Sequence, residues 1–245
     1  MVVESSTSTN NQNGSHDGVD ESLALDRLLE VSTVVLRQAI ELVENSLSSD
    51  EQLSAPSKYI PGSTIGKHLF YTRFLLLNPR ASVHGTSIPG KHLRHARDHF
   101  VLLLDSVSSP APHTLNYDIR LRNTPMETVR KAALDSFKEA ISRLEEIVPN
   151  VALDEPITLH AVTPFPQVVQ TTFGRELWFA ALHAVHHWSM LRVIAGELVR
   201  KFHVDGSLLI PIRSLQGITV EESLGFAPST LVYQGVEAPL GKSRI

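Results

Sequence analysis

Residues 172–199 read TFGRELWFAALHAVHHWSMLRVIAGELV, and this stretch decides the fold class that we expect. Its apolar side chains recur at helical spacing and cover more than half of the circumference, which predicts a long, well-buried helix capped by Thr172. A helix of this kind needs other apolar faces around it, so we expect it at the centre of a helical domain.

Three further segments show one apolar face at three- and four-residue spacing. They are residues 23–47, residues 90–106 and a stretch from Thr124 to Pro149. Thr124-Pro-Met-Glu127 has the order of an N-cap, a first-turn proline and a capping-box glutamate. Residues 156–163 are β-like and fit either a hairpin strand or an extended connection. Four amphipathic helices favour an all-α four-helix bundle with long loops.

The outer parts of the chain have a different composition. Residues 1–22 contain almost nothing large and apolar, so we expect a disordered tail. The bundle is expected over 23–234, followed by a C-terminal tail over 235–245.

Composition excludes several classes of function. The 245 residues carry a formal net charge of −4 and no cysteine. No basic stripe indicates nucleic-acid binding, and no signal sequence or membrane-spanning run is evident. We therefore expect a cytoplasmic protein with a small-molecule substrate, no nucleic-acid or membrane partner, and a homodimer as one option. Without cysteine, any metal must be bound by His, Asp or Glu.

Histidines gather in two of the expected helices. His92, His95 and His99 share a helix face within about 60°, and His183 and His187 are one turn apart with His186 beside them. Imidazoles at i and i+4 can bind one cation, and a third from a facing helix would leave one coordination position open. Ala184 stands where a zincin metalloprotease has its glutamate, which disfavours that chemistry.

Simpler interpretations stay open for several residues. The isolated histidines, such as His113 and His160, are expected to be ordinary core or boundary residues. Glu176 lies two turns before His183 and is either near the metal or, as we expect, a surface charge. Trp178 and Trp188 are expected in the core rather than in a pocket.

The segments IPGKHLRHARDHF and ELWFAALHAVHHWSM resemble the DinB/YfiT-like superfamily of metal-binding four-helix bundles, as do LNYDIRLRNTPMET and GFAPSTLVY. The resemblance implies an up-down-down-up topology. It also implies that His95, which precedes Asp98 by three residues, binds metal together with His183 and His187. His92, Asp98, His99 and His186 would then either lie around the metal ligands and orient them or face the substrate.

Two segments, 69–89 and 199–216, interrupt the resemblance, and we interpret them as insertions. Removing either would restore a continuous family-like sequence. The proposed metal ligands lie outside both segments, so the ligand set does not depend on this interpretation.

The resemblance implies a DinB-like metal-dependent protein, with zinc as the default ion and nickel, iron or manganese as alternatives. Its activity would be that of a thiol S-transferase, or a related hydrolase or isomerase, using a low-molecular-weight thiol that the metal binds as thiolate. The alternatives are a non-catalytic metal- or small-molecule-binding helical module and a structural bundle without metal.

Overall fold

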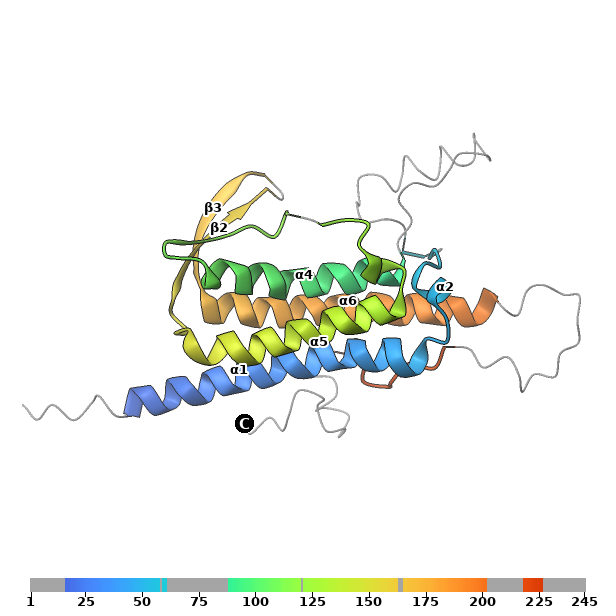
Figure 1. The fold of residues 1–245 in the computed structure, drawn as a ribbon, viewed down its shortest axis with the longest axis horizontal. Coiled ribbons are helices and arrows are strands. Elements are labelled where there is room, and N and C mark those ends of the chain that lie inside the picture. Colours follow the sequence, from blue (N-terminus) through green and yellow to red (C-terminus); the bar gives the residue numbers. More distant parts are fainter. Residues whose placement is uncertain are drawn as a thin grey trace, which may run out of the picture.

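Four long helices lie side by side in the computed structural model, which describes residues 16–57, 59–60, 88–119, 121–162, 165–201 and 218–226 (Figure 1). They are α1 (His16–Glu41), α4 (Pro89–Ser108), α5 (Arg130–Ile147) and α6 (Phe173–Lys201). α1 and α6 run in one direction, and α4 and α5 run in the opposite direction. Around the bundle, α6 packs between α1 and α4, while α5 covers the other side of that pair.

Short helical elements complete the connections. α1 continues into a π-helical turn, η1 (Leu42–Ser46), and a four-residue helix, α2 (Asp50–Leu53), follows it. Two 3-10 turns, η2 (Pro125–Glu127) and η3 (Val148–Asn150), stand before and after α5.

A small sheet covers one end of the bundle (Figure 1). Its strands are β1 (His113–Leu115), β2 (Pro156–Ala161) and β3 (Gln167–Thr172), in the order β1-β2-β3. β1 pairs with β2 in parallel, and β2 pairs with β3 in antiparallel orientation. Because β3 runs directly into α6, the sheet fixes the position from which α6 starts.

The predicted all-α four-helix bundle is wrong. The described residues form five α-helices and a three-stranded mixed sheet. Only residues 156–163 were β-like in the sequence. β1 has three residues and pairs with a strand far along the chain, and Val168 and Val169 are adjacent in β3, so neither strand shows a clear alternation.

Two helices start at positions that differ from those expected. α1 begins at His16, so residues 16–22 of the expected tail are helical, and residues 1–15 lie outside the described part of the chain. The capping box at Thr124 does not form: a 3-10 turn stands there, and the buried Thr124 hydroxyl has no hydrogen-bond partner. The Glu127 carboxylate instead accepts from the Asn123 N–H and pairs with Arg94.

The two segments interpreted as insertions fall mostly outside the described residues. Ile88 and Pro89 form the start of α4, and residues 199–201 belong to the end of α6. The expected C-terminal tail over 235–245 lies entirely outside the described residues.

The core lies between the four long helices and contains buried residues from each of them. Trp188 is fully buried, lies edge-on to Phe137 at 6.2 Å between ring centroids, and donates its indole N–H to the Val35 carbonyl at 3.0 Å. Trp188 is therefore a core residue, as expected. Trp178 is not, because half of its surface is exposed.

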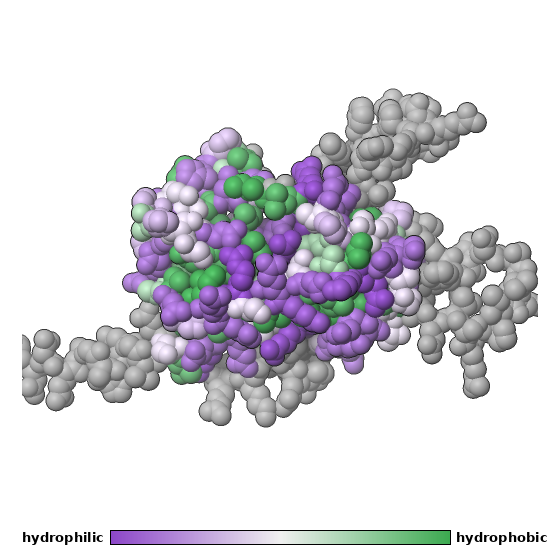
Figure 2. Space-filling model, viewed as in Figure 1, coloured by the Kyte–Doolittle hydropathy of each residue, from purple (hydrophilic) through white to green (hydrophobic). Residues whose placement is uncertain are grey.

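The face of the molecule seen in Figure 2 is largely hydrophilic with separate apolar patches. Several exposed large apolar side chains belong to the sheet and its flanking loops, namely Ile119, Leu121, Val162, Phe165, Val168 and Val169. No helix among the described residues combines the length and apolar character needed to cross a membrane.

Candidate metal centre

The packing of α4 against α6 brings all six clustered histidines together. α4 contributes His92, His95 and His99, and α6 contributes His183, His186 and His187. The spacing of three, four and seven residues keeps the α4 set on one helix face, and the four-residue spacing of His183 and His187 aligns that pair on α6, as the sequence predicted. We call these six residues the histidine cluster.

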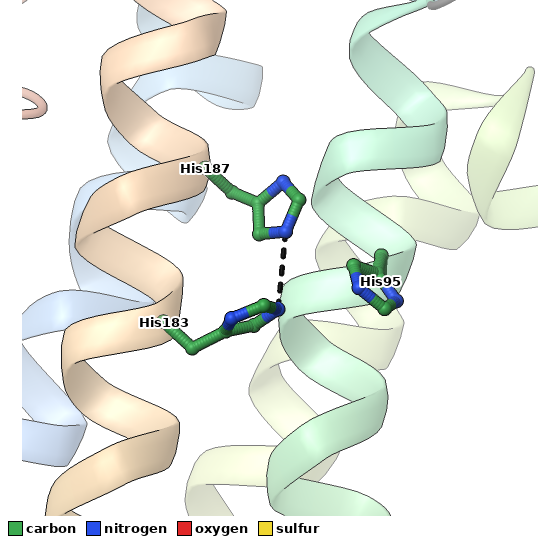
Figure 3. A group of neighbouring side chains, drawn as sticks. All are labelled: His95, His183 and His187. Carbon is green, nitrogen blue, oxygen red and sulfur yellow. Dashed lines mark hydrogen bonds between the residues drawn. The ribbon is translucent and has the colours of Figure 1, made fainter. Parts of the chain in front are cut away.

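Three rings of the cluster converge, as Figure 3 shows for His95, His183 and His187. One ligand nitrogen from each lies within 4.8 Å of the others. The Nε2 atoms of His183 and His187 are 3.1 Å apart. Two nitrogens bound to one tetrahedral zinc at roughly 2.05 Å would be about 3.3 Å apart, so the α6 pair already has nearly the separation of two ligands. His95 needs only a small approach to join them.

Burial keeps the imidazole rings of His92 and His187 neutral. His187 is 7% exposed, and this burial, together with repulsion from His183, His92 and His95, holds its pKa well below the ordinary value. Burial and the neighbouring His186 lower the pKa of His92 to about 4. A neutral imidazole is the form that binds metal, so the site is prepared for a cation at neutral pH.

His92 and His99 both lie next to the triad. The Nδ1 atom of His92 is 2.8 Å from Nδ1 of His187. His99 donates from Nδ1 to the His95 carbonyl at 3.0 Å, since a carbonyl oxygen can only accept. Its ring is stacked on Tyr117, at 4.5 Å, and lies tilted against His183, at 3.9 Å between centroids. His186 lies further out, 5.4 Å from the His187 ring.

Asp98 belongs to another cluster. One of its carboxylate oxygens pairs with Arg94 at 2.7 Å and the other with Arg97 at 3.2 Å. Arg94 also pairs with Glu127 at 2.9 Å. We call these four residues the arginine–carboxylate cluster. Asp98 therefore pairs with two arginines, and its place around the metal ligands, which the resemblance implied, stays a prediction.

The contact between Glu176 and Tyr117 could not be predicted from the sequence. Glu176 was expected at the surface but is fully buried, and it accepts from the Tyr117 hydroxyl at 3.0 Å, Thr171 at 2.8 Å and Arg175 at 2.7 Å. Burial and the Glu176 charge raise the pKa of Tyr117 well above its ordinary value. Tyr117 follows β1, so its stacking on His99 could be predicted only with knowledge of the sheet.

Fold and site together define a helical bundle protein with a capping sheet and a histidine cluster between two of its helices. No family model matches the chain, and no solved structure matches it. It is 28% identical over 222 residues to FK506-binding protein 5 of Rhizopus delemar. The match covers 87% of this chain and 40% of the relative, so the chain spans less than half of that protein's length.

These comparisons contradict the DinB/YfiT-like resemblance. The curated relative is named as an FK506-binding protein, and no family model supports DinB-like membership. The thiol S-transferase, hydrolase or isomerase activity that the resemblance implied is withdrawn with it. The resemblance rested on short histidine motifs, and such motifs follow from helical spacing, which unrelated bundles share.

Proposed function

We propose that this protein binds a divalent transition-metal ion through His95, His183 and His187. The observation that carries the proposal is the convergence of three imidazoles from two helices within 4.8 Å, with the α6 pair at 3.1 Å. The ligands come from elements that pack along their lengths, so the helix packing itself assembles the site.

The donor set restricts the ion. Three neutral imidazoles suit zinc, nickel, iron or manganese and are poor ligands for calcium or magnesium, which prefer oxygen. Zinc is the default choice. Three protein ligands leave one tetrahedral position for water or a small molecule, and a bound zinc supplies Lewis acidity there.

Elemental analysis of the purified protein tests the proposal. We expect about one transition-metal ion per chain in the wild type and none in the triple variant His95→Ala, His183→Ala, His187→Ala. His113→Ala is the matched control, because His113 contacts Glu155 and the Ser106 carbonyl, away from the cluster. Equal metal content in the wild type and the triple variant would refute the site.

A second candidate function is binding of FK506, and it rests on the name of the relative alone. Because the match covers 40% of that protein, its ligand site lies either within the matched region or outside it. Calorimetric titration of this chain with FK506 decides between the two. Measurable binding that survives in the triple histidine variant would establish a ligand site separate from the metal centre.

The cytoplasmic location expected from the sequence also stands as a proposal. Fractionation of cells that express a tagged chain tests it, and recovery in the membrane or secreted fraction would contradict it.

A further inference from the structure

We infer that His92 is a positioning residue for the proposed metal centre, because it accepts a hydrogen bond from His187 and thereby turns the Nε2 lone pair of His187 toward His95 and His183. The inference rests on the proposed metal-binding function. It adds that the metal-binding tautomer of His187 is already selected in the metal-free protein.

The contacts of His187 lead to this inference. Its Nδ1 atom faces Nδ1 of His92 at 2.8 Å, and its Nε2 atom faces Nε2 of His183 at 3.1 Å. A neutral imidazole carries one N–H, so one of these two hydrogen bonds is donated by His187 and the other is accepted. Only two arrangements of the protons are therefore available to this ring.

The two arrangements differ in their fitness for metal binding. If His187 donates from Nε2 to His183, the nitrogen nearest the other two ligands carries a proton and cannot bind metal. If His187 donates from Nδ1 to His92, Nε2 keeps its lone pair at the focus of the triad and accepts the Nε2 proton of His183, and that proton must shift to Nδ1 of His183 before its Nε2 can bind metal. An orienting partner on the second ring nitrogen has this effect in metal-binding histidines generally.

The position of His92 supports a specific role. It lies one helical turn before His95 on α4, so one helix supplies both a proposed ligand and the orienting group for a ligand on α6. Both rings of the pair are buried, at 6% and 7% exposure, and water competes little for the bond between them. A hydrogen bond in such surroundings holds a ring orientation better than one at the surface.

Two substitutions separate positioning from packing. In His92→Asn, the side-chain oxygen can stand near the former Nδ1 position and accept from His187. In His92→Leu, the side chain fills a similar volume but accepts nothing. His160→Leu, at an exposed position on β2, is the matched control.

Competition titration with zinc is the first measurement. We expect His92→Leu to raise the zinc Kd about tenfold or more, the usual effect of losing an orienting partner, and His92→Asn to restore most of the affinity. The cobalt-substituted absorption spectrum should change in His92→Leu and return toward the wild-type spectrum in His92→Asn. Wild-type affinity in His92→Leu, or equal losses in both variants, would overturn the inference.

Imidazole 15N NMR of the metal-free wild type is the second measurement, and it depends on no variant and no metal. We expect the proton of His187 on Nδ1. A proton on Nε2 would overturn the inference, even if zinc binds. Failure of the wild type to bind any metal would refute the proposed function instead, and the NMR result would still decide the tautomer.

Discussion

Two buried polar clusters include residues of α4, and they differ in how the cost of burying polar groups is offset. The arginine–carboxylate cluster contains two positive and two negative side chains, joined at 2.7 to 3.2 Å, so its charges balance internally. The histidine cluster contains residues of one type: burial lowers the pKa of His92 and His187, and nitrogens of His95, His183 and His187 converge. The charges of the arginine–carboxylate cluster balance without any further group, whereas the histidine cluster brings together nitrogen ligands that one cation can bind.

The largest effect should come from removing a positive charge from the arginine–carboxylate cluster. Arg94→Met leaves the buried carboxylates of Asp98 and Glu127 without their shared partner. Breaking a buried ion pair from one side typically costs about 3–5 kcal/mol, so we expect a loss of that size in the free energy of unfolding, measured by urea denaturation.

Lys131→Met is the matched control for Arg94→Met. Lys131 and Asp135 are both mostly exposed in an ion pair of 2.7 Å, and such pairs contribute less than about 1 kcal/mol. Similar losses in the two variants would show that the arginine–carboxylate cluster is no more important than a surface pair.

Zinc bound at the histidine cluster should stabilise the folded protein. A ligand at 100 times its Kd that binds only the folded state adds about 2.7 kcal/mol to the free energy of unfolding. We expect zinc to raise the thermal midpoint of the wild type and to leave that of His187→Ala unchanged. Calorimetry with and without zinc measures both, and EDTA should reverse the shift. An equal shift in both proteins would place the bound zinc elsewhere.

The difference between the clusters explains how far the sequence could predict the site. The grouping of His183 with His187, and of His95 with His99, follows from the helical period alone, and the structure has both pairs on single helices. Asp98 could not be placed this way, because Arg94 and His95 are both near it along α4. Arg94 pairs with Asp98 within α4, and it also pairs with Glu127 of η2, a contact that is not local in sequence.

The fold was predictable to a similar extent. The four long helices were visible as apolar stripes, whereas β1 was not, because a three-residue strand is defined by its partner rather than by its own pattern. The burial of Glu176 could not be predicted either, because the tyrosine that binds its carboxylate follows β1.

A smaller effect is expected where α4 meets η2, beside the arginine–carboxylate cluster. A Cβ added at Gly90 would lie 2.0 Å from the Glu127 carbonyl oxygen, so Gly90→Ala must push the two backbones apart. We expect a loss of about 2 kcal/mol in unfolding free energy, in the range of overpacked cores.

Gly196→Ala provides the contrast to Gly90→Ala. Nothing lies within 4 Å of an added Cβ at this exposed position of α6. Alanine is favoured over glycine inside a helix by roughly 0.8–1.0 kcal/mol, so this variant should be more stable than the wild type. Denaturant titration measures both variants, and a stable Gly90→Ala protein would contradict the close approach.

A pH-dependent effect is expected at Tyr117, whose ring lies against His99 in the histidine cluster while its hydroxyl binds buried Glu176. The folded protein holds the pKa of this phenol well above its ordinary value of 10.0. Its stabilising contribution is therefore complete below pH 10 and is lost as the pH rises further, when the unfolded chain releases a proton that the folded chain retains. The loss approaches about 1.4 kcal/mol per pH unit for one such group.

Urea denaturation at several pH values above 10 should show a shallower decline for Tyr117→Phe than for the wild type. Tyr59→Phe, at an exposed position, should keep the wild-type slope, and equal slopes in all three proteins would mean that the Tyr117–Glu176 contact does not hold the phenol proton.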